Sequence, residues 1–399
     1  MGTEALSDMP PAPAVRDGEC VRNTPAEQPA QRLLSLDVLR GLTVAVMILV
    51  NNAGDGAVSF AQLRHSVWNG CTLTDVVFPL FLFIVGASIT LAFSARIDRG
   101  ASRRTILLQV ARRSALIALI GLLLNALPFF DLGNLRYYGV MQRIALCYAL
   151  ASAIYLAGRV AASVAASAMA LAGYWWLLVH VPVPGVGTPG VTLGILDKYG
   201  NLAAWLDRLL VPPAHLYHHG VYDPEGLLST LPAVASTLLG VLAAAWLRSA
   251  HSARTKAIAL FAGGIVMLNC GLLWSQSFPL NKRLWTSSFV LFTAGISMAL
   301  LALIYWLVDG PVQLRRGLAP WLVFGTNALT AYVLSEILGI ALGAIGLPGG
   351  VNLQQRLFRL LPRWLGPAPA VSVIYSILFV FVCYLPVLVL YRKKILIKL

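Results

Sequence analysis

Long runs of apolar residues, separated by short polar stretches, dominate this chain. Many of the runs reach the roughly 20 residues that an α-helix needs to cross a hydrocarbon core of about 30 Å. They are continuous and do not alternate with polar residues, so helices are expected rather than barrel strands. We expect ten membrane spans, near residues 34–51, 75–95, 107–127, 138–157, 160–180, 227–247, 256–275, 285–308, 320–345 and 370–391. The predicted fold class is an all-α, polytopic membrane bundle.

The composition agrees with this pattern. Of the 399 residues, 58% are hydrophobic and 12% are charged, whereas soluble domains carry about 25% charged residues. The predicted spans leave little chain for a soluble domain. Residues 1–31 differ from the rest because proline, acidic and small residues are frequent there, and this composition predicts a disordered cytoplasmic tail. Residues 32–399 are expected to form the transmembrane domain.

Basic residues are concentrated on one side of the predicted bundle. That side has sixteen, namely Arg96, Arg99, Arg103, Arg104, Arg112, Arg113, Arg159, Arg248, Arg254, Lys256, Arg315, Arg316, Arg392, Lys393, Lys394 and Lys398. The opposite side has nine, namely Arg64, Arg136, Lys198, Arg208, Lys282, Arg283, Arg356, Arg359 and Arg363. The positive-inside rule then places both termini in the cytoplasm. The net charge of +14 is therefore explained by topology, and no nucleic-acid partner is expected.

Three loops are expected on the outer side, near residues 52–74, 181–226 and 346–369. Long irregular loops in a compact protein are usually functional. Within the third loop, "VNLQQRLFRLLPRW" places apolar and basic residues at helical spacing, which predicts a short helix on the outer surface.

The first outer loop carries the residues best suited to catalysis, in the stretch "LRHSVWNGCTLTDVVFPLFLFIVG". At neutral pH the imidazole of His65 can accept a proton from an amine that becomes a nucleophile. The amides of Asn51 and Asn69 suit sugar hydroxyls or a developing oxyanion, and Trp68 offers a flat face to a pyranose ring. Asp75 could act on the imidazole, by orienting it or by taking up the second proton, or, like Asn51, it could cap a helix.

Ionisable and amide side chains inside the predicted spans indicate a watered cavity, since each costs free energy in lipid unless it is paired or hydrated. Asp37 and Arg40 are spaced for an intrahelical ion pair. Gln142 and Arg143 lie early in the span near 138–157, and Arg143 has no acid three or four residues away. It therefore needs a partner from another helix or an anionic ligand. Asn327 and Glu336 lie in the span near 320–345.

The second outer loop contains "HLYHHGVYDPEG", with His215, His218, His219, Asp223 and Glu225. Its His-x-x-His-His spacing lacks the glutamate of the His-Glu-x-x-His zinc helix. The five cysteines of the chain contain no CxxC pair. We therefore expect no metal, and we interpret this stretch as a polar lid whose acids bind a sugar or an amine.

The motifs "RLLSLDVLRGL", "LVNNAGDG", "LRHSVWNGCTLTD", "GVMQRIALCY", "LDRLLVPPAHLYHH", "YDPEG" and "LNKRLW" occur in this order. Together they resemble the heparan-α-glucosaminide N-acetyltransferase family. The resemblance implies transfer of the acetyl group of cytoplasmic acetyl-CoA to the amino group of a glucosamine on the other side of the membrane. It implies that His65, in "H-x-x-W-N-G", is catalytic and that Asn51 is its partner.

The CoA phosphates that this resemblance implies require cations, for which Arg40 and Arg143 are the buried candidates, with the arginines that flank the span near 107–127 at its cytoplasmic end. Gln142 is expected to contact the cofactor as well. Either the acetyl group passes directly to the amine, which we favour, or His65 first becomes acetyl-imidazole. The chain differs from the lysosomal members, which carry a lumenal domain before the first motif, and this difference favours a shorter bacterial form in an inner membrane. The lipid bilayer and an amino sugar are the expected partners, and homodimerisation stays open.

Two other functions remain open at this point. A transporter of amino sugars would suit a ten-helix bundle in which Pro79 interrupts a span, although no second copy of "LDVLRG" or "WNG" occurs later in the chain. O-acetylation of a surface polysaccharide is the other alternative.

Overall fold

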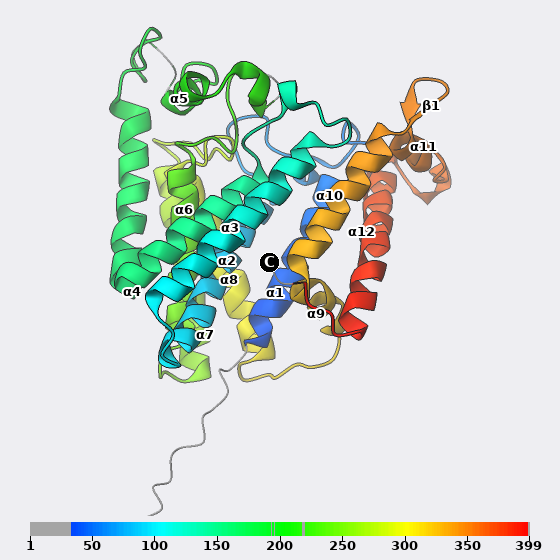
Figure 1. Cartoon of the computed structure of the whole chain (residues 1–399). Coiled ribbons are helices and arrows are strands. Elements are labelled where there is room, and N and C mark those ends of the chain that lie inside the picture. The colour runs from blue at the N-terminus through cyan, green and yellow to red at the C-terminus, as the bar shows by residue number, and fades with distance from the viewer. Residues whose placement is uncertain (1–32, 193, 195, 218–219, 398–399) are drawn as a thin grey trace, which may run out of the picture. The chain divides into compact units, whose positions relative to one another are not determined.

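The computed structural model describes residues 33–192, 194, 196–217 and 220–397. The tail predicted for residues 1–31 lies outside this part of the chain, as do His218 and His219. The described residues are mainly helical (Figure 1). The α-helices are α1 (Leu34–Asn51), α2 (Leu73–Asp98), α3 (Arg103–Ala126), α4 (Val140–His180), α5 (Leu202–Leu210), α6 (Thr230–Leu247), α7 (Ala253–Trp274), α8 (Ser287–Val308), α9 (Ala319–Thr326), α10 (Ala328–Ala344), α11 (Leu353–Arg359) and α12 (Ala368–Arg392).

Short elements occur in the connections. The 3₁₀ helices are η1 (Ala61–Leu63), η2 (Leu132–Asn134), η3 (Pro213–His215) and η5 (Arg363–Leu365). Two strands, β1 (Gly346–Leu347) and β2 (Val351–Asn352), pair antiparallel with Leu347 opposite Val351. They lead directly into α11, which is the short helix predicted in this loop.

All ten predicted spans correspond to helices. Eight helices of the described chain are long and apolar enough to cross a membrane: α1, α2, α3, α4, α6, α7, α8 and α12. The 41-residue α4 contains two of the predicted spans, because non-helical backbone at Gly158 and Arg159 divides it (Figure 1). The tenth span is the pair α9 and α10, which meet at a bend of 83°. The all-α, polytopic membrane bundle is therefore confirmed.

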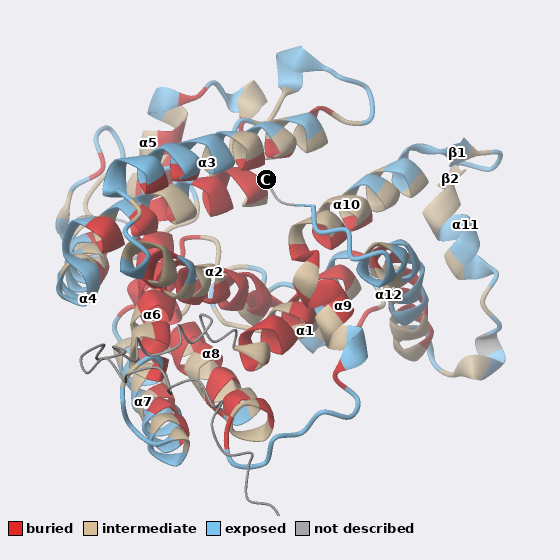
Figure 2. Ribbon diagram, turned by 60° about the horizontal axis from the view of Figure 1, so that its bottom comes forward, coloured by how far each residue is buried: buried red, intermediate tan, exposed pale blue. Residues whose placement is uncertain are grey.

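The centre of the bundle is formed by α2 and α6, which α1 and α8 flank (Figure 2). In the most apolar stretch of α2 and of α6, 78% of residues are buried, against 22% in α3 and in α7. The exposed faces of α3 and α7 are rich in leucine, isoleucine, valine and phenylalanine. A helix with such a face is stable in contact with lipid chains, so α3 and α7 are peripheral helices of a membrane protein.

Two glycines allow α2 and α6 to touch backbone to backbone. A Cβ atom at Gly86 would lie 1.7 Å from the carbonyl oxygen of Thr237, and one at Gly240 would lie 1.9 Å from that of Phe83. Small residues at such crossings are how membrane helices gain packing energy, since lipid supplies no hydrophobic force between them. This close contact fixes α2, which carries much of the candidate site.

We expect Gly86→Val to destabilise the bundle by about 2 kcal/mol or more, because the added side chain forces α2 away from α6. Gly173→Val is the matched control, since Gly173 is an exposed helical glycine with no atom within 4 Å of the place that a Cβ atom would take. Thermal unfolding of the two variants in detergent measures the difference. Equal melting temperatures would contradict the close packing of α2 on α6.

Candidate active site

Asp75 organises the start of α2. Its Oδ2 accepts hydrogen bonds from the Thr72 backbone N–H at 3.1 Å, from the Thr72 hydroxyl at 3.0 Å and from the Ser66 N–H at 3.0 Å. Its Oδ1 accepts a hydrogen bond from Nδ1 of His65 at 2.7 Å. The sequence left two roles open for Asp75, and the geometry provides both: the carboxylate closes a capping box with Thr72 and it holds the imidazole.

A tight turn after α7 brings a lysine to the same imidazole. Nζ of Lys282 lies 2.9 Å from Nδ1 and 3.3 Å from Nε2 of His65, and 3.6 Å from Oδ1 of Asp75. The turn is rigid because Asn281 accepts from the Leu284 N–H at 2.9 Å and donates to the Asn69 side chain at 3.0 Å. The Gly70 N–H also donates to the Leu280 carbonyl at 2.7 Å. These contacts join the loop of His65 to the turn of Lys282.

The surroundings of His65 shift the pKa of its imidazole in the direction that favours the neutral ring. Burial lowers the pKa of His65 below its ordinary value of 6.5, the hydrogen bond to Asp75 opposes this, and the positive charge of Lys282 lowers the pKa further. Burial also lowers the pKa of Lys282 itself, against the attraction of Asp75 and Glu225. Because Nδ1 donates to Asp75, the lone pair of the neutral ring is on Nε2.

The opposite side of the site is held by Arg136, which precedes α4. Its Nε donates to Asp223 at 3.0 Å, and its NH2 group donates to Asp223 and to Glu225 at 2.5 Å each. Burial alone would raise the pKa of Glu225, but the Arg136 guanidinium holds it below its ordinary value. The guanidinium also lies 4.8 Å from the ring centroid of Tyr217. The Asp-Pro-Glu stretch is therefore fixed by a bidentate arginine.

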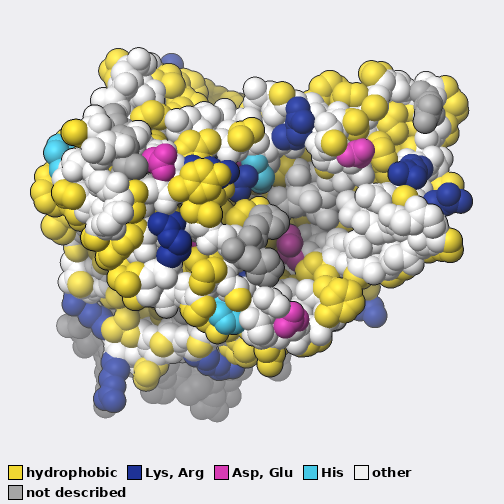
Figure 3. Space-filling model, turned by 90° about the horizontal axis from the view of Figure 1, so that it is seen from above, with side chains coloured by type: hydrophobic (Ala, Val, Ile, Leu, Met, Phe, Trp, Pro, Cys, Tyr) yellow, Lys and Arg dark blue, Asp and Glu magenta, His cyan; other side chains and the backbone are white. Residues whose placement is uncertain are grey.

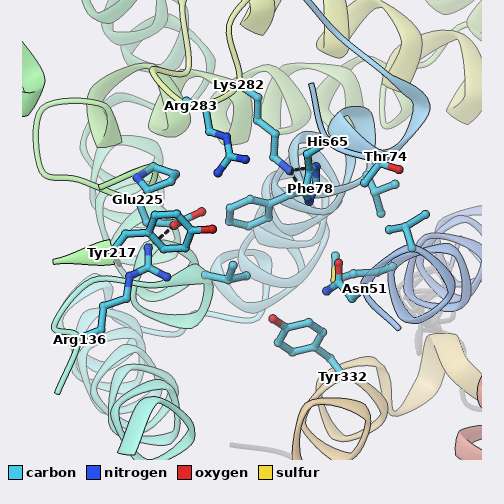
Figure 4. A pocket seen from close by; sticks show the side chains of 15 residues that line it. Asn51, His65, Thr74, Phe78, Arg136, Tyr217, Glu225, Lys282, Arg283 and Tyr332 are labelled. Atoms are coloured by element: carbon cyan, nitrogen blue, oxygen red, sulfur yellow. Dashed lines mark hydrogen bonds and ion pairs between the residues drawn. The ribbon is translucent and has the colours of Figure 1, made fainter. Parts of the chain in front are cut away.

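These groups surround a cavity of about 210 Å³ (Figure 4). His65 and Lys282 lie on one side of it, Arg136 and Glu225 on another, and Asn51 near Tyr332. The remaining lining residues are Met47, Val50, Thr74, Val77, Phe78, Val140, Tyr217, Pro224 and Arg283. In the view of Figure 3 this face of the molecule is hollowed, with basic, acidic and histidine side chains near the hollow. The cavity combines a base, several cations and aromatic faces.

The structure places some of the predicted site residues at this cavity and others behind or beside it. His65, Asn51 and Glu225 line it. Asp75 and Asp223 are buried behind His65 and Arg136. Trp68 and Asn69 line an adjoining hollow of about 510 Å³, where the Trp68 indole donates to the Leu196 carbonyl at 2.8 Å. His215 bonds the Leu135 carbonyl at 2.8 Å and stacks on Tyr137.

A second cavity of about 430 Å³ lies further along α2. Val77 and Phe78 line the first cavity, and Phe81, Ile84, Ser88 and Phe93 line the second. Three arginines line the second cavity, namely Arg40, Arg96 and Arg113. Arg40 also donates to Asp37 at 2.9 Å, which is the ion pair expected from the sequence. Ile397 is another lining residue, and the Asn327 side chain holds the backbone of Ile395 and Ile397 at 3.1 Å each.

Gln142 and Arg143 immediately precede Ile144, which lines the second cavity, but neither is among the described residues that line either cavity. Arg143 is buried, donates to the Gly226 carbonyl at 3.0 Å and to the Ser229 hydroxyl, and lies 5.2 Å from the Trp285 ring centroid. The sequence required a partner from another helix or an anionic ligand for Arg143, and in the structure the start of α6 provides the partner. Gln142 is buried beside Gly121.

Sequence reasoning missed several lining residues. Arg136 and Lys282 were counted as charges on the outer side, Tyr217 lay within a quoted motif without an assigned role, and Tyr332 was not singled out. The one signal for Lys282 was its place in the "LNKRLW" motif. No local pattern places it against His65, which is 217 residues away in the chain. Among the described residues, no group of three or more His, Cys, Asp or Glu side chains could hold a metal ion.

Comparison with known proteins identifies the family. The family model described as "Heparan-alpha-glucosaminide N-acetyltransferase, catalytic" matches residues 32–272. The human heparan-alpha-glucosaminide N-acetyltransferase is 32% identical over 361 residues, covering 77% of this chain and 53% of that protein. The mouse protein of that name is 31% identical over 364 residues, which cover 77% of this chain and 54% of the mouse protein. The chain belongs to the heparan-alpha-glucosaminide N-acetyltransferase family.

The chain spans about half the length of these two relatives. The matched region of the family model includes Asn51, His65, Arg136 and Glu225, and it ends before Lys282. The family resemblance seen in the motifs is therefore confirmed.

Asp207 of α5 supports the Asp-Pro-Glu stretch from behind. The carboxylate is buried, and its Oδ1 accepts from the Leu227 N–H at 3.0 Å. Burial raises the pKa of Asp207 from 3.8 to about 7. Between these two pH values the unfolded chain has released this proton while the folded protein retains it.

We therefore expect the contribution of Asp207 to stability to fall as pH rises from about 4 to about 7, and to level off above that. Asp207→Asn should remove this decline. Melting temperatures of the two proteins, measured in detergent over this pH range, give the comparison. Parallel curves for the original protein and the variant would contradict the raised pKa.

We expect Arg136→Met to destabilise the protein by about 3 kcal/mol, since it leaves two buried carboxylates without their cation. Arg64→Met is the control, because Arg64 is exposed and its guanidinium donates one long hydrogen bond within the described part of the chain, of 3.3 Å to the Ala57 carbonyl. Chemical or thermal unfolding in detergent measures both variants. If Arg136→Met lowers the stability of the protein no more than Arg64→Met does, the ion pairs of Arg136 contribute little to that stability.

Proposed function

We propose that this protein is an acetyltransferase that moves the acetyl group of cytoplasmic acetyl-CoA to the amino group of a glucosamine-type sugar on the outer, periplasmic side of a bacterial inner membrane. The main support is the arrangement along α2, where a cavity lined by His65 is followed by a cavity lined by three arginines. Family membership supports amino-sugar N-acetylation in particular.

The acceptor amine is proposed to bind in the cavity of His65. A neutral imidazole, with Nδ1 held by Asp75, can take the amine proton on Nε2 as the nitrogen attacks. The amide of Asn51 lines the same cavity and suits the developing oxyanion. Phe78 and Tyr217 offer apolar faces to a sugar ring, and Glu225 offers a hydrogen-bond acceptor. Asp75 and Asp223 act through His65 and Arg136.

Trp68 and Asn69 lie beside this cavity rather than in it. The Asn281 side chain donates to the Asn69 side chain at 3.0 Å, and Asn281 directly precedes Lys282, which lines the cavity of His65. We therefore propose that Trp68 and Asn69 contact the part of the acceptor that extends from the reacting sugar.

The donor is proposed to enter through the second cavity. Arg96 and Arg113 lie in the basic segment that the positive-inside rule assigns to the cytoplasm, and with Arg40 they provide the cations that CoA phosphates require. Gln142 and Arg143, which precede Ile144 of this cavity in α4 but do not line it, stay proposed contacts of the donor.

In the direct reaction, the amine nitrogen forms a bond to the thioester carbonyl carbon and loses a proton to His65. The carbon–sulfur bond then breaks, and the proton passes to the leaving thiolate. The products are an N-acetyl sugar and CoA. In the alternative, the His65 imidazole itself accepts the acetyl group before the amine arrives. An acetylated His65 formed without acceptor, at a rate that matches turnover, would establish the relay.

We expect inside-out membrane vesicles that contain the protein to convert enclosed glucosamine to labelled N-acetylglucosamine when labelled acetyl-CoA is supplied outside. His65→Ala should lower the rate at least about 100-fold, in line with the loss of a general base. His251→Ala is the control, because His251 lies in the exposed connection between α6 and α7. The label is quantified in the sugar after separation from CoA.

The other outcomes of this assay identify the alternatives. Sugar that crosses the vesicle membrane without being acetylated would indicate a transporter. Label recovered as an ester of a supplied polysaccharide, and not as an amide, would indicate O-acetylation. Equal N-acetylation by the original protein and by His65→Ala would refute the proposed role of His65.

We expect Arg113→Gln to raise the KM for acetyl-CoA about tenfold, because it removes one cation from the proposed phosphate site. The KM for the sugar should stay unchanged. Arg112→Gln is a close control, since the neighbouring Arg112 is exposed and is not among the described residues that line the second cavity. Steady-state kinetics with each substrate varied in turn gives both constants, and a larger effect on the sugar would contradict the assignment.

A further inference from the structure

Lys282 occupies a position that the proposed reaction does not yet use. Its Nζ lies within 3.3 Å of both ring nitrogens of His65, and its side chain is only 14% exposed. Trp285 anchors the turn that carries it: this indole is fully buried, contacts Phe78 edge to face and donates to the Ser236 hydroxyl at 3.1 Å. The lysine is therefore held at the imidazole by packing on α2 and α6.

The contact with His65 is not an ordinary hydrogen bond. Nδ1 already donates to Asp75 at 2.7 Å, so it has no lone pair for an ammonium hydrogen in the same tautomer. The nearly equal distances from Nζ to Nδ1 and Nε2, 2.9 and 3.3 Å, also differ from the geometry of a donor aimed at one nitrogen. The main effect of Lys282 on the ring is therefore its charge.

Within the described part of the chain, the other charges that face His65 come from three segments. Asp75 of α2 contacts the ring directly and favours its protonated form. Arg283 of the Lys282 turn disfavours that form. Glu225 lines the same cavity, but its carboxylate is bonded to Arg136 at 2.5 Å. Without Lys282, the carboxylate of Asp75 would be the dominant charge at the imidazole.

We propose that Lys282 is a positioning residue whose ammonium offsets the charge of Asp75 and keeps His65 neutral in the resting protein. Asp75 is needed to hold the ring and select the tautomer, but alone it would promote protonation of Nε2 and remove the lone pair that accepts the amine proton. Lys282 opposes this protonation, because a protonated imidazole would place a second positive charge within 3.3 Å of Nζ. The proposal uses the proposed function only in taking His65 as the base.

The protonation state of His65 can be measured without any turnover. Diethyl pyrocarbonate reacts with neutral imidazole and not with imidazolium, so the initial rate of modification against pH reports the pKa of the histidine. Mass spectrometry of the peptide that contains His65 makes the reading specific. The full chain in detergent is used without donor or acceptor, at a low extent of reaction, from pH 4.5 to 8.

We expect Lys282→Met to move the midpoint of His65 modification upward by about one pH unit, and Lys282→Arg to keep it near that of the original protein. Lys256→Met, which changes a lysine at the start of α7, should leave the midpoint unchanged. Lys282→Gln provides a second neutral variant if Lys282→Met does not fold. An unchanged midpoint in the neutral variants, or equal shifts in Lys282→Arg and Lys282→Met, would overturn the proposal.

Kinetics gives an independent reading. If His65 is the base, the acidic limb of kcat/KM against pH should move upward in Lys282→Met by the same amount as the modification midpoint. A protein that transfers no acetyl group would refute the proposed function while the modification midpoints still tested the role of Lys282. If the protein is active but the midpoint of His65 modification is unchanged in Lys282→Met, only the proposed role of Lys282 is refuted.

Discussion

The hydrogen bonds of the Asp75 carboxylate connect the fold of this protein to its chemistry. One oxygen closes the N-terminus of α2 and binds the backbone of the preceding loop, and the other holds the imidazole of His65. Because α2 is packed against α6 with glycine at the contact, the carboxylate is attached to the most buried part of the bundle. The hydrogen bond to Asp75 therefore ties the orientation of the His65 side chain, which is 39% exposed, to the buried start of α2.

The same helix lines both of the cavities that the proposed reaction would use. The lining of the first passes from Thr74 to Phe78, and that of the second begins at Phe81. A polar cavity inside a membrane protein is costly unless its charges are paired or hydrated. Here Arg136 is paired with two acids at one cavity, and Arg40 with Asp37 at the other. In the proposed reaction the acceptor would bind in the first cavity and the donor in the second, with α2 lining both.

Much of the fold was predictable because membrane insertion depends on local properties. The length of an apolar run decides whether it can span the hydrocarbon core, and all ten predicted runs are helical. The break of α4 at Gly158 and Arg159 was anticipated as a boundary between two spans, since an arginine there follows a glycine between apolar runs. The 83° bend between α9 and α10 was not, because the backbone turns at Asn327 within a sequence that reads as one apolar run.

The sequence by itself determined the helical membrane fold and the family, because run length and motif order belong to short segments, and it singled out the loop of His65 and Asp75 as the candidate site. The tertiary structure alone decided which groups meet at the imidazole. Lys282 is 217 residues from His65, and Arg136 is 87 residues from Asp223. Such contacts depend on how helices pack and turns close. It was also packing that left Arg143 bound to the start of α6, since a buried cation takes whichever acceptors the neighbouring helix presents.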